Sequence, residues 1–476
     1  MPRLTRRLFL AGTAAAVAAP ALGAPATPSE DFDVVVIGAG AAGIAAARRL
    51  AAEKRRFVVL EASDRIGGRC ITDTTLFGVP FDRGAHWIHE PRINPLAKLA
   101  RGTGLDVYAA PRGQNLRIGR RSARTSELEV YLATLERANR AIAQAARGKT
   151  DLSCAKALPD DLGPWQNTAD FVLGPFACGK DLDDISARDF ARSRERNSDA
   201  FCREGYGTLL AHLAQNLPIR LSTPVHRVSW GSRVSVETDA GRIKANHVII
   251  TASTDILLSD RIAFEPALPK SHSDALGQLR LGSYDHIALE LEGNPLCARQ
   301  DDIIFEQASD ERTAAVLANV GGTSLAMVEV GGRFGRSLSA QGEQAMVDFA
   351  VEWLSNLYGP SVHRALGRSH ATRWNQSPWI GGAFSAAAPG GQGARRTLSE
   401  PLRNRVFFAG EAAHETLWGT VGGAWESGER AANAALKLLP PPAGKPGAKP
   451  AAKPVRAKAK SRPTRARQRK QRNRSR

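Results

Sequence analysis

The stretch DVVVIGAGAAG at residues 33–43 decides how this chain folds. The four apolar, mostly β-branched residues after its first Asp are typical of a buried parallel strand. The glycines then follow as G-x-G-x-x-G, and the alanine-rich run 44–52 predicts a helix. Gly38 permits the tight turn, Gly40 lets the backbone approach a pyrophosphate, and Gly43 lets helix and strand pack closely. The positive end of the helix then faces the phosphates.

The sequence that follows supplies the context that a lone G-x-G-x-x-G lacks. A second strand, FVVL at residues 57–60, ends at Glu61, 23 positions after Gly38. An acid about 20 residues after the first glycine is typical of the group that binds ribose hydroxyls. We therefore predict a dinucleotide site here. The alternative is a Gly-rich turn in an ordinary α/β protein.

Length and composition indicate a globular protein of two domains. The chain has 476 residues, too many for one small core, and its hydrophobic content of 43% is ordinary. The formal net charge of +18 is unevenly placed, because residues 440–476 hold 14 Lys and Arg and no acid. The high net charge therefore does not describe the active site.

The first 26 residues have the three parts of a signal peptide: a basic start, a short apolar middle and a region of small residues. The pair Arg6-Arg7 followed by LFL resembles a bacterial twin-arginine signal, which directs folded proteins to their own export machinery. No second apolar stretch of about 20 residues follows. We expect a soluble protein in the periplasm or another extracytoplasmic location, exported by the twin-arginine route. A disordered basic leader is the alternative.

The C-terminal residues 439–476 alternate Pro, Ala, Lys and Arg. Such a segment cannot bury a core, and we predict a disordered basic tail. Its positive charges favour salt-sensitive contact with a polyanion. A tail that is merely solvated is the alternative.

Two further motifs bear on the family. Residues 61–69, EASDRIGGR, carry a Gly pair for close backbone approach and Arg69 to neutralise pyrophosphate charge. Residues 84–89 read GAHWIH. Together with NPL at 94–96, these motifs resemble the flavin-dependent amine oxidases, a family that includes monoamine and polyamine oxidases.

The resemblance implies an α/β fold of two domains. A Rossmann-type FAD-binding domain is expected to be discontinuous and interleaved with an α+β substrate domain. Its three segments are predicted at 31–90, 205–264 and 395–438, and the substrate domain at 91–204 and 265–394.

The substrate segments carry their own patterns. Apolar residues at helical spacing predict a long amphipathic helix over 127–146, with one face formed by Leu128, Leu132, Leu135, Ala138 and Ile142. Within 265–375, strand-like runs alternate with one predicted helix at 340–357. This pattern is typical of an antiparallel sheet with a helix.

The resemblance also implies which residues hold FAD. Val225 would meet the adenine end through its backbone, and Glu411 would lie near the ribityl and pyrophosphate. Ala383 occupies the position where some monoamine oxidases attach the flavin through cysteine, so non-covalent FAD is expected. The predicted cofactor-binding residues are Gly38, Gly40, Gly43, Glu61, Arg69, Gly84, Ala85, His86, Trp87, Val225, Gly410, Glu411, Thr420 and Val421.

By resemblance, the reaction oxidises a small amine of the monoamine or polyamine class at its α-carbon. A hydride passes to flavin N5, water hydrolyses the imine to a carbonyl compound, and oxygen is reduced to hydrogen peroxide. No metal is required, and the five cysteines form no C-x-x-C and no zinc pattern. Two alternatives stay open: a flavin dehydrogenase or desaturase that uses another acceptor, and a non-catalytic flavoprotein whose basic tail binds a polyanion.

Three residues are the predicted catalytic group: His286, Phe384 and Trp87. Phe384 aligns with one of two aromatic walls that sandwich the amine in monoamine oxidases, where a ring makes apolar or amine–π contacts. The second wall would fall at Thr420, which is not aromatic, so Trp418 or Trp87 is expected to replace it. A plain core aromatic is the alternative for Phe384.

His286 falls where the family usually has a lysine that holds a water against flavin N5. A histidine can also hold a water, and its ordinary pKa lies near working pH. We predict that His286 takes part in substrate oxidation or flavin reoxidation. The alternative is an ordinary strand histidine.

Overall fold

The computed structural model describes residues 30–193 and 198–441. The signal peptide predicted for residues 1–26 and nearly all of the predicted tail lie outside these ranges. Within them, no helix is both long and apolar enough to cross a membrane.

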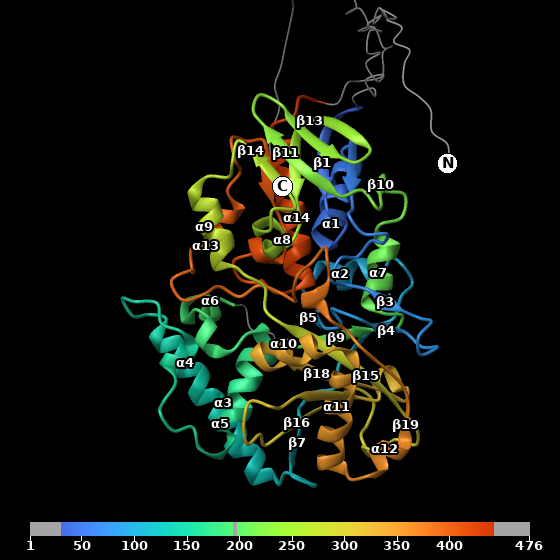
Figure 1. The fold of residues 1–476 in the computed structure, drawn as a ribbon, viewed down its shortest axis with the longest axis vertical. Helices are drawn as coiled ribbons and strands as arrows, with labels where there is room; N and C mark the ends of the chain where they lie inside the picture. The colour runs from blue at the N-terminus through green and yellow to red at the C-terminus, as the bar shows by residue number, and fades with distance from the viewer. Residues whose placement is uncertain (1–29, 194–197, 442–476) are drawn as a thin grey trace, which may run out of the picture. The chain divides into compact units, whose positions relative to one another are not determined.

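An eight-stranded sheet carries the Gly-rich turn, in the upper part of Figure 1. Its central strand β1 pairs in parallel with β2 on one side and β13 on the other. The apolar residues at 34–37 are all buried, as a central parallel strand requires. In spatial order the strands are β10 (Ile219–Arg220), β2 (Phe57–Leu60), β1 (Glu30–Ile37), β13 (Gly241–Ile250), β12 (Val234–Thr238), β11 (Val225–Trp230) and β14 (Ala263–Glu265), with β20 (Val406–Phe408) beside β13.

Two alanine-rich helices pack together against this sheet. They are α1 (Ala41–Ala52) and α14 (Val421–Leu436), which come from opposite ends of the sequence. Small side chains allow a close approach, and a Cβ on Gly428 would lie 2.0 Å from the carbonyl oxygen of Ala42. Other helices of this region are α2 (Pro95–Ala100), α7 (Tyr206–Leu213), α8 (Thr254–Leu258), α9 (Lys270–Gln278) and α13 (Ala394–Ser399).

A second, seven-stranded sheet lies in the lower part of Figure 1. It is antiparallel except where β16 and β7 run in parallel, a pairing that the predicted antiparallel sheet did not include. The strands β7 and β8 of this sheet come from the predicted substrate segment 91–204. In spatial order the strands are β19 (Leu366–Ala371), β15 (Tyr284–Leu291), β18 (Leu325–Gly331), β17 (Ala315–Ala318), β16 (Asp302–Glu306), β7 (Asn115–Ile118) and β8 (Arg121–Ser122).

Helices cover one face of the second sheet. The helix predicted at 340–357 is present as α11 (Glu343–Tyr358), three residues shorter at its start, but a second helix before it, α10 (Gly332–Gln341), was not predicted. Gly342 lies between them with φ +112°, a conformation that ends a helix and that residues with a Cβ rarely adopt. The short α12 (Ser361–Ala365) follows.

Strand periodicity divides the residues of β15 between two faces. Ile287 and Leu289 join the core beneath α11. His286 and Ala288 therefore point to the opposite face, because successive side chains of a strand alternate. That second face meets the cavity described below.

A group of helices flanks the second sheet (Figure 1): α3 (Thr125–Ala145), α4 (Cys154–Ala157), α5 (Gln166–Phe171) and α6 (Ala187–Arg192). Helix α3 matches the predicted helix closely, and Ala138 and Ile142 of its predicted apolar face are buried. Leu132 of that face is instead 51% exposed, and Tyr131 is buried beside it. Short ladders complete the fold: β5 (Ile88–His89), β9 (Asp199–Cys202) and β6 (Val107–Ala109), and β3 (Thr72–Asp73) with β4 (Phe81–Asp82).

Candidate functional site

Residues of both sheets line one large cavity. Its volume is about 1650 Å³, and its walls include the Gly-rich turn after β1 and the residues Tyr284 and His286 of β15. Pockets for small ligands usually measure about 300 to 1,000 Å³. This cavity therefore has room for a dinucleotide and a small substrate together.

The Gly-rich turn has the geometry that its sequence predicts. Gly38 has φ +99°, and Gly38 and Gly40 both line the cavity. A Cβ on Gly43 would lie 1.9 Å from the carbonyl oxygen of Gly38, so this position can hold only glycine without movement of the backbone. Gly43 thus packs helix against turn, while the other two glycines leave the backbone open to the cavity.

Glu61 ends β2 and fixes the turn. Its carboxylate accepts the backbone N–H of Ala39 (2.7 Å), and the N–H and hydroxyl of Ser63 (2.9 and 2.7 Å). The residue is 8% exposed and lines the cavity. Glu61 therefore holds the turn rigid, and its contact with ribose hydroxyls stays a prediction.

Arg69 and Glu411 form an ion pair at the cavity wall, with 3.0 Å between Nη1 and Oε1. Glu411 also accepts the backbone N–H and hydroxyl of Ser385 (3.1 and 2.8 Å) and the N–H of Gly419 (2.9 Å). Four donors from three parts of the sequence converge on one carboxylate. This carboxylate ties the predicted third cofactor segment to the Gly-Gly-Arg motif.

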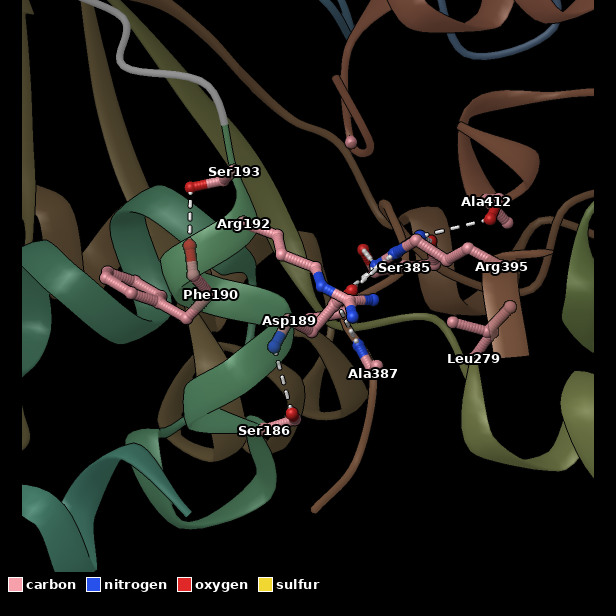
Figure 2. Close-up of polar contacts among 12 residues, drawn as sticks. Ser186, Asp189, Phe190, Arg192, Ser193, Leu279, Ser385, Ala387, Arg395 and Ala412 are labelled. Atoms are coloured by element: carbon pink, nitrogen blue, oxygen red, sulfur yellow. Dashed lines mark hydrogen bonds and ion pairs between the residues drawn. The ribbon is translucent and has the colours of Figure 1, made fainter. Parts of the chain in front are cut away.

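A buried network of polar contacts extends from Ser385 through Arg395 to Asp189 (Figure 2). Arg395 binds Asp189 of α6 through Nε (2.9 Å) and Nη2 (2.8 Å), and both side chains are 1% exposed. The guanidinium also donates to the Ser385 hydroxyl and to the Ala412 carbonyl, each at 3.1 Å. The network links the helical group of the second region to the carboxylate of Glu411.

The GAHWIH motif lies along the cavity. A Cβ on Gly84 would lie 2.0 Å from the carbonyl oxygen of Arg69, which explains this glycine by close backbone approach. His86 Nδ1 is 2.9 Å from Asp82, and its ring stacks on Phe201 at 4.5 Å. The four predicted residues of this motif, Gly84, Ala85, His86 and Trp87, all line the cavity.

The start of α14 faces the cavity through Thr420, Val421 and Ala424. The Thr420 hydroxyl accepts the N–H of Gly423 (2.9 Å) and so caps the helix. A threonine here therefore serves the helix start, in place of an aromatic wall. Val225 and Gly410 line the same cavity.

The aromatic wall differs from the predicted one. Phe384 and Tyr284 both line the cavity, and their ring centroids are 5.8 Å apart. Phe176 extends the wall, 6.2 Å from Tyr284. Trp418 as a replacement wall is wrong, because it is 1% exposed and packs under the Arg395 guanidinium at 4.7 Å. Trp87 does line the cavity.

His286 reaches the cavity from β15 and is otherwise buried. Its Nδ1 is 3.1 Å from the carbonyl oxygen of Asp82, which only accepts, so Nδ1 carries the proton. Burial lowers the pKa of His286 to about 4. The ring is therefore neutral at pH 7, and its Nε2 is free of a proton.

Sequence reasoning missed Tyr284. The signal was present, because Tyr284 precedes His286 by two positions and strand alternation places both on one face. Phe176 and Phe305 were also missed. Each lies on a separate element, and only the tertiary fold brings their rings to 5.1 Å from one another.

The residues present fit a flavin dinucleotide. A backbone cradle at the Gly-rich turn, the open start of α14 and an arginine line one continuous cavity. In the part of the chain that the structure describes, no group of three or more His, Cys, Asp or Glu side chains is arranged to hold a metal ion.

Comparison with known proteins agrees with this fit. The sequence model of the family described as flavin containing amine oxidoreductase matches residues 41–436. This chain belongs to that family. The match begins inside α1 and ends at the last residue of α14, so it spans both sheets.

Members of the family with curated descriptions are distant in sequence. Human lysine-specific histone demethylase 2 is 27% identical over 84% of this chain and 53% of its own length. Rice polyamine oxidase 4 is 26% identical over 85% of this chain and 89% of its own. The chain thus spans about half the length of the histone demethylase relatives.

Solved structures of the family share the fold. Putrescine oxidase with bound putrescine superimposes with a TM-score of 0.74 at 19% identity, covering 86% of this chain and all of the other. Cyclohexylamine oxidase from Brevibacterium oxydans IH-35A gives 0.72 at 22% identity, over 86% and 99% of the two chains. At these identities the likeness establishes the two-domain amine oxidase fold.

Proposed function

We propose that this protein is an FAD-dependent oxidase that converts an amine to an imine, which water hydrolyses to a carbonyl compound. The observation that carries the proposal is a convergence: the glycine cradle after β1 and the wall of Phe384, Tyr284 and His286 line one cavity. Bound FAD would accept a hydride at N5 and pass its electrons to oxygen, which gives hydrogen peroxide.

The chain's own residues would hold FAD without a covalent bond. Gly38 and Gly40 would receive the pyrophosphate, and the start of α14 would lie beside the flavin ring. Ala383 offers no thiol. Cys70 lines the cavity, but burial raises the pKa of its thiol well above the ordinary value, so it stays protonated and unreactive. To test for a covalent bond, the protein is denatured by heat and filtered. Flavin that passes through the filter is not covalently bound.

The cavity wall supports a primary amine that carries an apolar group. Apolar and aromatic side chains form the wall around Phe384, and an amine near the rings gains amine–π contact. These wall residues are Val172, Leu173, Phe176, Tyr284, Ile303, Phe305 and Phe384.

A polyamine is the second candidate, because Asp199 and Asp301 also line the cavity and could meet a distal ammonium. Both carboxylates already have partners in the protein. Asp199 lies 2.6 Å from His89, and Asp301 accepts from the Tyr108 hydroxyl (3.0 Å). The monoamine is therefore the better-supported substrate.

Before a hydride can leave carbon, the substrate nitrogen must lose its proton. We assign this step to His286, whose neutral ring lines the cavity with its Nδ1 proton held by the Asp82 carbonyl. Phe384 and Tyr284 exclude water on the same side. Trp87 completes the wall from the GAHWIH motif.

Anaerobic mixing of the purified flavoprotein with separate amines tests the proposal. The panel includes cyclohexylamine, putrescine, a longer polyamine and an amino acid, and flavin absorbance is recorded. We expect bleaching by the apolar monoamine first, and formation of peroxide when air is admitted. Bleaching without reoxidation by oxygen would indicate a dehydrogenase, and no bleaching by any compound would contradict the proposal.

We also propose export by the twin-arginine route, on the strength of Arg6-Arg7 and the signal-like residues 1–26. Replacement of both arginines by lysine is expected to retain the protein in the cytoplasm. For the basic tail we propose salt-sensitive contact with a polyanion. Deletion of residues 442–476 should abolish binding to heparin and leave turnover unchanged; loss of turnover would favour a function that resides in the tail.

A further inference from the structure

Helix α3 presents an exposed apolar side chain to the cavity. Leu132 is 51% exposed and lines the cavity, and so does Leu128, which lies four residues before it on the same helix. A single exposed leucine on a protein surface is ordinary and needs no explanation. An exposed leucine in the wall of a substrate cavity is different, because a bound ligand can cover it and remove it from water.

A neighbouring residue of the same helix shows the contrast. Val130 is 48% exposed, almost as much as Leu132. It lies outside the cavity wall that the described residues form. Val130 is therefore an ordinary exposed side chain, whereas Leu132 belongs to the cavity.

An apolar strip joins Leu132 to the aromatic wall at the proposed reaction site. The ring of Tyr284 lies 5.8 Å from that of Phe384, and the ring of Phe176 lies 6.2 Å from that of Tyr284. Phe176 and Leu128 pack against one and the same hydrophobic cluster. Leu132 follows Leu128 on one face of α3, because residues four apart on a helix are neighbours. These five residues, which all line the cavity, are called the apolar strip.

A π-helical turn adds further apolar side chains beside the strip. The turn is the short helix Val172–Phe176, and such turns are rare and are frequent at functional sites. Val172 and Leu173 line the cavity together with Phe176. A Cβ on Gly331 would lie 2.4 Å from the carbonyl oxygen of Pro175, so the end of β18 packs closely against this turn. The middle of the strip is thus held on the second sheet.

We propose that the substrate is a primary amine with a long, unbranched alkyl chain that lies along the apolar strip and reaches Leu132. The amino group lies beside Phe384 and Tyr284, and the methylene groups cover Phe176 and Leu128. A chain on this path meets only apolar side chains of the strip, so a second ammonium there has no acid to bind. The inference rests on the proposed amine oxidation and names the substrate class for it.

A series of amines of increasing length tests the proposal. Propylamine, hexylamine and decylamine are mixed anaerobically with the purified flavoprotein, and the rate of flavin reduction is measured against amine concentration. We expect affinity to rise about two- to fourfold for each added methylene group, as the burial of a CH₂ group predicts. The limiting rate of reduction should change little, because the carbon that is oxidised is the same. Affinity that does not rise with chain length would overturn the inference.

The substitution L132Q places a polar group of similar size at the outer end of the strip. Its affinity for decylamine should fall about 5- to 10-fold, the scale expected when part of a leucine side chain loses its apolar contact. Its affinity for propylamine, which is too short to reach α3, should stay at the wild-type value. Both effects are read from the same anaerobic measurement.

The matched control is V130Q, which makes a similar change at an equally exposed position of the same helix. It should bind decylamine as tightly as the wild type does. Decylamine affinity that is equal in L132Q and the wild type, or that falls equally in L132Q and V130Q, would show that the chain does not reach Leu132.

Failure of the proposed function gives a different result from failure of this inference. If no amine of the series reduces the flavin, amine oxidation itself is wrong, and the inference fails with it. If propylamine reduces the flavin and decylamine binds no more tightly than propylamine, amine oxidation stands and the inference alone fails.

Discussion

The Gly-rich turn after β1 and the strand pair β15–β18 reach the same cavity by opposite means. At the turn, the groups that face the cavity are backbone atoms, and the residues that place them lie within six positions of one another. At the strand pair, the groups are side chains, and His286 meets Glu329 only because the ladder aligns them. Substitutions at the turn should therefore destabilise the fold by steric conflict. Substitutions at the strand pair should lower the reaction rate while the fold stays intact.

The largest effect should come from G43V at the turn. A Cβ at this position meets backbone, 1.9 Å from the Gly38 carbonyl oxygen, and backbone cannot move aside cheaply. We expect destabilisation of about 5 kcal/mol or more, at the exceptional end for single substitutions. Flavin content and the unfolding midpoint in urea measure it.

The control for G43V is G277A, since a Cβ on Gly277 in α9 would have open space. There the substitution should stabilise by about 0.5 to 1 kcal/mol through the unfolded chain. Normal flavin content in G43V would show that the turn tolerates a side chain, and would remove the contrast between the two regions.

The next effect tests the link between the regions. R395M leaves Asp189 buried without its cation, and such a loss typically costs about 3 to 5 kcal/mol. The double variant D189N/R395M should recover part of this cost, because no unpaired charge remains. Urea unfolding of the single and double variants gives the coupling between the two residues.

The exposed pair of Lys270 and Asp274 provides the reference, since D274A should change stability by less than about 0.5 kcal/mol. A cost for R395M as small as that of D274A would mean that the buried network does not hold Glu411 in place.

A smaller effect belongs to the aromatic wall. F384A removes the ring beside Tyr284, and we expect amine affinity to fall about 10- to 30-fold, or about 1.5 to 2 kcal/mol. Flavin content should not change. F334L, at an aromatic pair between α10 and α11, is the matched control. Unaltered amine affinity in F384A would assign Phe384 to packing alone.

The smallest expected effect is a pH dependence of stability at Asp285, the neighbour of His286 on the opposite face of β15. Burial raises the pKa of Asp285 from 3.8 to about 6. The acid therefore contributes stability below pH 3.8, and this contribution is lost as pH rises through about 6. Between pH 5 and 7, D285N should gain about 1 kcal/mol relative to wild type. Thermal melts at both pH values measure the gain, and an equal difference at the two would contradict it.

These two regions also mark what the sequence could predict. Gly38 and Gly43 could be assigned because the tight turn and the close packing of helix on turn demand glycine, and the G-x-G-x-x-G spacing shows that demand locally. Gly84 was predicted only through the family resemblance, because its close neighbour Arg69 lies 15 positions away. Glu329 could not be placed, since an acid in a strand usually points to solvent and only pairing with β15 places it opposite His286. Helix α10 was missed because Gly332 and Gly335 weaken the helical pattern of its sequence.

Each sheet pairs strands that are far apart in the sequence, and this affects how the chain folds during synthesis. Strand β20 enters the first sheet from residues 406–408 and pairs with β13, while β7 and β16 of the second sheet are nearly 200 residues apart. Neither sheet can close while its last strand is still inside the ribosome, and such non-local pairing is slow. A nascent chain therefore exposes the part of β13 at 248–250 until residues 406–408 have been made. The cell must shield that part of β13 from other chains, and premature stops before residue 406 should yield aggregates instead of a shortened enzyme.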